Sequence, residues 1–245
     1  MILAVVVMAL AAFEFFGRCV ERGYRPAVIP GIVACALLPV AGYTQGETGL
    51  VLGVFLAFVA TCVATLAGNG EHPALLDVGI TMLGVVWIGM MGGFAGLILS
   101  FGKPYGTDTF FLLVLGIVAN DVGALAIGSA AGRTPLREWV SPNKTVEGFI
   151  GGAIMTFGAL LIVSLAIKEP STWNDWSEWV RLGILIAVLA PIGDLTESMF
   201  KRSLEIKDFG TLLPGHGGVL DRFDGFLFVM PAAYYAVRLI KPWMP

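Results

Sequence analysis

Long apolar runs separated by short polar loops dominate the chain. A helix needs about 20 apolar residues to cross the hydrocarbon core of a bilayer. Runs of about this length lie at 1–16, 27–43, 48–66, 76–100, 108–131, 146–167, 180–200 and 219–240. They are continuous and do not alternate as the strands of a membrane barrel do. The pattern predicts an all-α fold, a polytopic integral membrane helical bundle with about eight transmembrane helices.

The composition agrees with a membrane protein. Hydrophobic residues make up 57% of the chain and charged residues 13%, whereas a soluble domain carries about 25% charged residues. These values exclude a water-soluble globular enzyme, a disordered chain and a disulfide-stapled secreted module. The net charge of −3 gives no reason to expect a nucleic-acid partner. The three cysteines lie in or beside apolar runs without a CxxC motif, which is typical of small buried hydrophobic residues.

Short loops leave no room for a soluble domain between the spans. We therefore expect residues 1–245 to form a single membrane domain, in which 1–105 supply scaffold and dimerisation helices. Residues 106–245 would carry the catalytic helices and the cytoplasmic loops. The run at 1–16 lacks a basic n-region and is interrupted by Glu14, so a membrane span is favoured over a signal peptide.

The basic residues predict the orientation of the bundle. Ten of the 15 follow the first, third, fifth and seventh runs: Arg18, Arg22, Arg25, Arg133, Arg137, Lys144, Lys201, Arg202, Lys207 and Arg222. The positive-inside rule makes this side cytoplasmic. Eight spans then place both termini outside the cytoplasm, and one further preceding span would place the amino terminus inside.

The densest group of charges lies between Asp194 and Asp224. The spacing i, i+3, i+4, i+7 places four polar side chains on one helix face: Asp194, Glu197, Ser198 and Lys201. Asp221 and Asp224 are three residues apart and share a face at the start of the last run. Ionisable groups at membrane depth are costly and mark functional sites by default, and Asp121 within the fifth run is another.

Carboxylates without nearby cysteine or paired histidine suit Mg²⁺ better than Zn²⁺. The basic residues of the same segment suit phosphate groups: Lys201, Arg202, Lys207 and Arg222. Residues 214–218 read Pro-Gly-His-Gly-Gly, a tight turn whose glycines let backbone approach a ligand closely. The alternative is an internal ion-pair network that ties two helices together, but such a network would not need this turn.

A second polar loop precedes the run at 146–167. Ser141 followed by Pro142 predicts a helix start, which would place Lys144 and Thr145 in the first turn. Free backbone N–H groups, a hydroxyl and an ammonium at a helix start form an anion site. The alternative is an ordinary cap whose basic residues obey the positive-inside rule.

The segment Ser198–Asp224 resembles the signature of the phosphatidate cytidylyltransferases, also called CDP-diacylglycerol synthases. The matching positions are Ser198, Lys201-Arg202, Lys207-Asp208, His216-Gly217-Gly218 and Asp221-Arg222-Phe223-Asp224. Further matches are Asp121, Ser141–Thr145 with Glu147-Gly148, and Glu14–Phe16 leading to Gly23–Pro26. The resemblance covers nearly the whole chain. One departure is that the family usually begins with a further apolar span.

The resemblance implies the reaction of CTP with phosphatidate to give CDP-diacylglycerol and pyrophosphate. It also implies a multi-pass enzyme of the cell inner (plasma) membrane, with its active site facing the cytoplasm and with membrane lipid as a partner. A homodimer and Mg²⁺ are expected, and a second, monovalent cation is a further possibility. The implied metal ligands are Asp194, Asp221 and Asp224.

The residues suit this chemistry, because the attacking phosphate is already anionic and the obstacle is repulsion between two polyanions. The expected catalytic residues are Asp194, Asp221, Lys201 and Arg222. The expected substrate contacts are Ser141, Asn143, Lys144, Thr145, Arg202, Lys207, His216, Gly217 and Gly218. His216 either donates to a phosphate oxygen or stabilises the turn, and Asp208 orients Lys207 or Arg202.

Two rival functions remain from the sequence. One is a CTP-dependent polyprenol or lipid-alcohol kinase, which would transfer the γ-phosphoryl group. The other is an ion-coupled transporter with buried acids at helix breaks. A transporter site normally lies near the midplane between symmetric halves. Here the charges gather at one face in the C-terminal half without an internal repeat, which disfavours transport.

Overall fold

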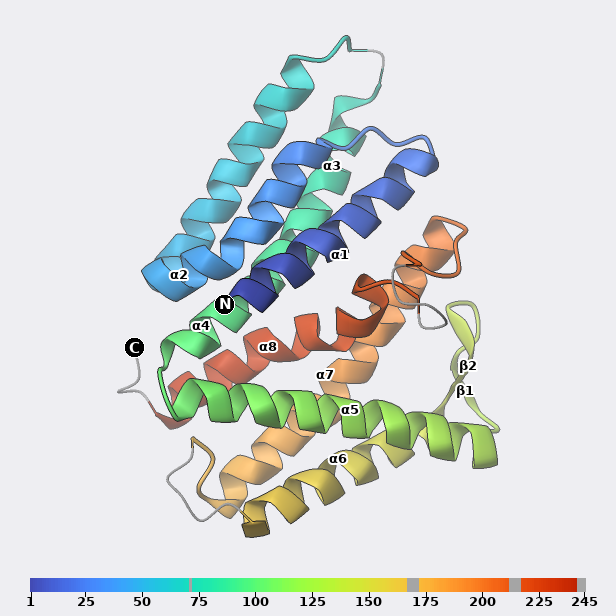
Figure 1. Cartoon of the computed structure of the whole chain (residues 1–245). Helices are drawn as coiled ribbons and strands as arrows, with labels where there is room; N and C mark the ends of the chain where they lie inside the picture. The colour runs from blue at the N-terminus through green and yellow to red at the C-terminus, as the bar shows by residue number, and fades with distance from the viewer. Residues whose placement is uncertain (71, 167–171, 212–216, 242–245) are drawn as a thin grey trace. The chain divides into compact units, whose positions relative to one another are not determined.

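The structure, a computed structural model, describes residues 1–70, 72–166, 172–211 and 217–241 (Figure 1). Over these residues it contains seven helices that are long and apolar enough to cross a membrane. They are α1 (Ile2–Glu21), α2 (Val28–Leu66), the span Ala74–Ser100, α5 (Tyr105–Ala131), α6 (Val146–Ala166), α7 (Trp176–Ser203) and α8 (Leu220–Ile240). The predicted all-α membrane bundle is confirmed, and the chain is a multi-pass membrane protein.

Helix α2 contains two of the predicted spans. Its 39 residues would reach about 58 Å as one straight helix, well beyond a hydrocarbon core of about 30 Å. The helix breaks at Gly46, whose φ of 65° and ψ of −153° are not helical. The chain reverses there, so that two arms lie side by side in Figure 1. The arms correspond to the predicted spans 27–43 and 48–66, which accounts for the expected number of about eight.

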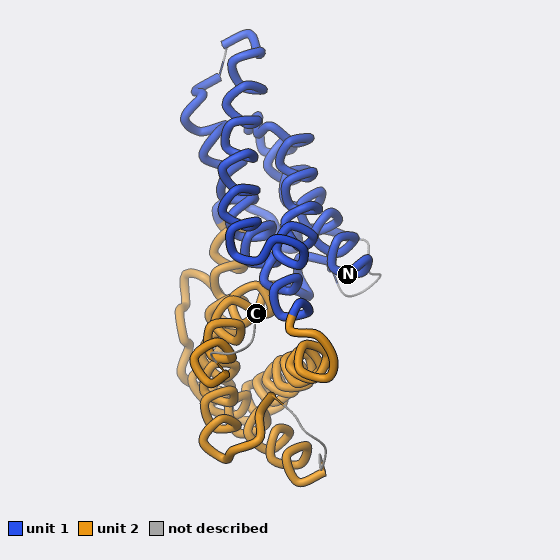
Figure 2. Tube along the Cα trace, turned by 90° about the vertical axis from the view of Figure 1, so that its left-hand side faces the viewer, with its two compact units in different colours: residues 1–100, 203–223 blue, residues 101–202, 224–245 orange. Residues whose placement is uncertain are grey.

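The chain divides into two compact units, coloured separately in Figure 2. Unit 1 comprises residues 1–100 and 203–223, and unit 2 comprises residues 101–202 and 224–245. The segment 203–223, which carries part of the family signature, therefore belongs with the N-terminal helices. The assignment of scaffold and dimerisation roles to residues 1–105 stays a prediction.

Unit 1 packs its helices through aromatic rings and small residues. The span Ala74–Ser100 is formed by α3 (Ala74–Gly84), a π-helical stretch η1 (Val85–Met90) and α4 (Met91–Ser100). The rings of Phe15 and Trp87 lie edge to face at 5.8 Å, and both contact Phe209. A β-carbon added at Gly84 would lie 2.6 Å from the ring of Phe16, so this glycine makes room for it. Small residues at helix contacts are typical of membrane bundles.

Gly96 of α4 provides a stability prediction. A β-carbon there would overlap the backbone oxygen of Pro39 in α2, and backbone cannot move aside as a flexible side chain can. We expect Gly96→Ala to lower the free energy of unfolding by about 1–3 kcal/mol. Thermal unfolding in detergent measures this change. Gly79→Ala is the control, because no atom lies within 4 Å of its added β-carbon; equal effects at both sites would contradict the prediction.

Unit 2 brings α5 and α6 into close contact. A β-carbon added at Gly123 would lie 2.7 Å from the Gly151 oxygen, and one added at Gly151 would lie 2.9 Å from the Gly123 oxygen. The buried Asn120 amide donates a hydrogen bond of 3.1 Å to the Thr156 hydroxyl across the same contact. Close backbone approach and an interhelical hydrogen bond both stabilise helix association in lipid.

The predicted helix start at Ser141 is wrong. Residues Ser141–Thr145 form strand β2, which pairs antiparallel with β1 (Pro135–Arg137), and α6 begins at Val146. Glu147 in the first turn of α6 accepts hydrogen bonds of 3.1 Å from the backbone N–H groups of Arg133 and Thr134, which ties α6 to the residues just before β1. The helix cap is Thr145, whose hydroxyl accepts the Gly148 N–H at 3.1 Å.

Candidate active site

Unit 2 brings three acids together where α7 meets α8. Asp194, Glu197 and Asp224 each offer a carboxylate oxygen, and these oxygens lie within 4.8 Å of one another. The two acids of α7 share a face, as their spacing predicts. Gly193 brings the helices close, because a β-carbon there would lie 2.6 Å from the Asp224 backbone oxygen. A glycine next to Asp194 thus allows the carboxylate of α8 to join those of α7.

Two ammonium groups neutralise part of this acidic cluster. Lys144 Nζ lies 2.5 Å from Asp194 Oδ1 and donates to the Ser198 hydroxyl at 3.0 Å. Lys201 Nζ lies 2.5 Å from Glu197 Oε2. The Glu197 side chain is 1% exposed, whereas that of Asp194 is 44% exposed. The cluster therefore combines a buried carboxylate, Glu197, with an accessible one, Asp194, and each is paired with a lysine.

The donor atoms of the cluster fit a hard divalent cation. All three side chains offer oxygen, which Mg²⁺ prefers. Glu197 was recognised on the shared face but was not included among the predicted metal ligands. Its position three residues after Asp194 was the available signal. Asp121 on α5 is exposed and is not one of the three grouped carboxylates.

The hairpin supplies Lys144 from β2. Ser141 is half-buried and Asn143 is exposed on the same strand. Arg202 Nε donates to the Val140 oxygen at 3.1 Å, which ties α7 to the hairpin. Arg202 was predicted to contact phosphate, and this hydrogen bond gives it a structural partner as well.

Unit 1 holds the other signature residues that the structure describes. Asp221 accepts backbone hydrogen bonds from Phe209 at 3.0 Å, Gly210 at 3.5 Å and Gly218 at 2.8 Å. Gly217 has a φ of +81°, which favours glycine. Asp221 therefore ties the backbone of Phe209 and Gly210 to that of Gly218. Its role as a metal ligand stays a prediction.

The remaining predicted residues of this segment are placed as follows. Lys207, Asp208 and Arg222 are exposed. His216 lies outside the described residues. The phosphate contacts predicted for Lys207, Arg222 and His216 therefore remain predictions, as does the orienting role predicted for Asp208.

Glu14 is a residue of this region that the sequence reasoning did not assign to the site. Its Oε1 accepts the Val219 N–H at 3.0 Å and its Oε2 accepts the Leu220 N–H at 2.9 Å. These N–H groups lie at the start of α8, where the helix itself offers them no acceptor. Two local signals were available, the acid interrupting the first apolar run and the match of Glu14–Phe16 to the family. The partners of Glu14 lie more than two hundred residues further along the chain.

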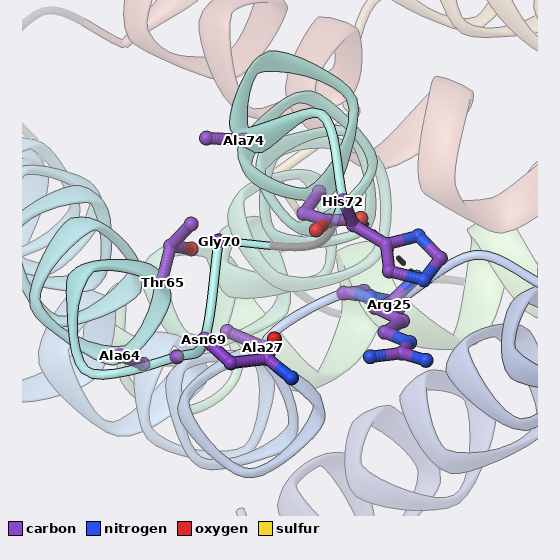
Figure 3. Close-up of a pocket in the computed structure, with 11 residues that line it drawn as sticks. Arg25, Ala27, Ala64, Thr65, Asn69, Gly70, His72 and Ala74 are labelled. Atoms are coloured by element: carbon purple, nitrogen blue, oxygen red, sulfur yellow. Dashed lines mark hydrogen bonds between the residues drawn. The ribbon is translucent and has the colours of Figure 1, made fainter.

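A pocket of about 250 Å³ in unit 1 lies apart from these residues in the sequence (Figure 3). Its lining includes Arg25, Asn69, His72 and Asp77, and the Arg25 N–H donates to Asp77 Oδ1 at 3.2 Å. None of the predicted site residues lines this pocket. It therefore gives no support to the predicted chemistry.

Comparison with known proteins agrees with the signature. The cytidylyltransferase family matches residues 1–240. A phosphatidate cytidylyltransferase of Bacillus subtilis is 37% identical, over 97% of this chain and 89% of that protein. One from Mycobacterium bovis is 31% identical, over 97% of this chain and 80% of that protein. The chain belongs to the cytidylyltransferase family.

Proposed function

We propose that this protein is a phosphatidate cytidylyltransferase, which makes CDP-diacylglycerol and pyrophosphate from CTP and phosphatidate. The observation that carries the proposal is the cluster of Asp194, Glu197 and Asp224 with Lys144 and Lys201 beside it. The names of its relatives support the substrates. These relatives are not named as kinases, so the lipid-alcohol kinase is not favoured.

The reaction needs charge neutralisation more than proton transfer. An oxygen of the phosphatidate phosphate attacks the α-phosphorus of CTP and forms a new P–O bond. The bond from the α-phosphorus to the bridging oxygen of the β-phosphate breaks, and pyrophosphate leaves with that electron pair. Because the nucleophile is anionic, no strong general base is required. The ammonium groups of Lys144 and Lys201 would offset the repulsion between the two substrates.

Asp194, Glu197 and Asp224 would hold Mg²⁺. When bound there, the ion would neutralise phosphate charge and stabilise the pyrophosphate leaving group. The half-exposed carboxylate of Asp194 would face the substrates, while buried Glu197 would stay paired with Lys201. A second, monovalent cation stays a prediction from the resemblance, as does Asp221 as a metal ligand.

The bacterial relatives support a place in the inner membrane. The active site would face the cytoplasm, where CTP is available, in agreement with the positive-inside rule. A homodimer stays a prediction from the resemblance, and the mass of the detergent-solubilised particle would test it.

Detergent-purified protein tests the proposed reaction directly. With phosphatidate, Mg²⁺ and CTP labelled at the α-phosphate, we expect the label in a lipid-soluble product. Excess EDTA should reduce the rate at least about a hundredfold, because phosphate charge would then be left without its counter-ion. Thin-layer chromatography of the organic phase measures the label.

Label at the γ-phosphate provides the control. Cytidylyl transfer sends this label into water-soluble pyrophosphate, whereas a lipid-alcohol kinase would send it into lipid. Lipid labelled only from the γ-position would contradict the proposal and favour the kinase. Equal rates with and without EDTA would contradict the metal assignment while leaving the cytidylyl transfer intact.

A further inference from the structure

We propose that Glu14 is a positioning residue of the active site, so that α1 takes part in building the catalytic segment around Gly217, Gly218 and Asp221. The inference rests on the proposed function, because it gives these signature residues a part in cytidylyl transfer. It assigns a role to an acid of the first apolar run, which belongs to the part of the chain expected to be scaffold.

The Glu14 carboxylate binds the start of α8 with both oxygens. It accepts the N–H groups of Val219 at 3.0 Å and Leu220 at 2.9 Å. Helix α8 starts at Leu220, so these donors have no partner within the helix. A negative charge at a helix N-terminus also interacts favourably with the helix dipole. Glu14 thus caps α8 from another helix.

Two glycines make this contact possible. A β-carbon added at Gly210 would overlap Glu14 Oε1, and one added at Gly218 would overlap Glu14 Oε2. The backbone on both sides of residues 211–217 therefore approaches the carboxylate more closely than any side chain would permit. Since Gly218 belongs to the family signature, the Glu14 contact bears directly on a predicted substrate-binding residue.

Arg18 strengthens the attachment one helical turn further along α1. Its Nε donates to the Phe209 oxygen at 2.8 Å. Glu14 and Arg18 are four residues apart and share a face of α1. That face accepts backbone N–H groups through Glu14 and donates to a backbone oxygen through Arg18. The segment is therefore held by both kinds of backbone group.

The orientation of the Asp221 carboxylate depends on this arrangement. Asp221 accepts N–H groups from Phe209 at 3.0 Å and from Gly218 at 2.8 Å. Glu14 lies against the residue that follows each donor, Gly210 after Phe209 and Val219 after Gly218. Fixing the backbone fixes the orientation of Asp221, which is a predicted catalytic residue and metal ligand. Glu14 would act through Asp221 and does not itself need to touch substrate.

Glu14→Gln tests the inference, because it keeps the size of the side chain and removes its charge. One of its two terminal atoms becomes an N–H donor facing backbone N–H donors. We expect kcat to fall about 10- to 100-fold. Because Asp221 is a predicted metal ligand, the half-saturating Mg²⁺ concentration should also rise about tenfold. Glu14→Asp keeps the carboxylate and should recover part of the activity. Gly210→Ala should reproduce the loss by displacing the Glu14 carboxylate.

Hydrogen exchange supplies a readout that does not depend on activity. In Glu14→Gln we expect the Val219 and Leu220 amides to exchange about tenfold faster, with residues 74–100 unchanged. Glu47→Gln is the matched control, since it removes an exposed carboxylate of the same unit. It should leave kcat, the Mg²⁺ dependence and the exchange as in the natural chain.

Several outcomes would overturn the inference. These are natural kcat in Glu14→Gln, unchanged exchange at 219–220, or faster exchange throughout unit 1, which would indicate a general structural role. If the natural chain transfers no cytidylyl group, the proposed function fails by itself. The exchange comparison would then decide separately whether Glu14 holds the catalytic segment.

Discussion

Replacing Asp194 with asparagine is expected to lower kcat for CDP-diacylglycerol formation by at least about a hundredfold. The substitution keeps the shape of the side chain and removes an accessible charge of the acidic cluster, since the Asp194 side chain is 44% exposed. Asp224→Asn should have an effect of the same size, because its oxygen lies within 4.8 Å of those of Asp194 and Glu197. The incorporation of α-labelled CTP into lipid measures both losses.

Binding of Mg²⁺ without substrates separates the metal role from other effects. Calorimetric titration of detergent-solubilised protein should show affinity at least about tenfold weaker in Asp194→Asn. Asp175→Asn is the matched control, because Asp175 is exposed just before α7 begins. Thermal unfolding should be nearly the same for all three proteins. An Asp194 variant with near-natural turnover and Mg²⁺ affinity would contradict the assignment of this residue.

Most of the fold follows from the apolar pattern. Lipid excludes unpaired backbone groups, so an apolar run of sufficient length is constrained to be helical. The pattern even separated the two arms of α2, because Thr44–Glu47 is polar around Gly46. The hairpin at 135–145 could not be found in this way. Ser141-Pro142 is locally a good helix start, and the partners that override it, Arg133 and Thr134 bonded to Glu147, depend on tertiary structure.

The site was predictable where it depends on one helix. The spacing of Asp194, Glu197, Ser198 and Lys201 already places them together on α7. That Asp224 is the acid of α8 that joins them depends on how two helices cross at Gly193, which no local pattern reveals. Glu14 was missed for the same reason. Its hydrogen-bond partners are the backbone N–H groups of Val219 and Leu220. Almost every residue type carries such a group, so the identity of the donor residues does not reveal the contact.

Lys144 carries the second large prediction, and it has two parts of opposite sign. The Lys144 ammonium contacts the Asp194 carboxylate at 2.5 Å and would compete with a metal ion for it. In Lys144→Met we expect Mg²⁺ to bind at least as tightly as in the natural protein. We expect kcat/KM for CTP to fall about a hundredfold, because a charge-assisted contact to phosphate is lost. Calorimetry and initial rates measure the two parts independently.

Lys144→Arg keeps the charge but replaces a compact ammonium by a planar fork, so it should recover only part of the activity. Lys241→Met is the matched control, since it removes an ion-paired lysine, bonded to Glu178 at 3.2 Å, that has no predicted contact with substrate. It should keep the kcat/KM of the natural protein.

If Lys144→Met weakened Mg²⁺ binding and activity together, Lys144 would be acting by arranging the carboxylates. If only the activity fell, the ammonium would act on phosphate, as its place on β2 beside the accessible carboxylate leads us to expect.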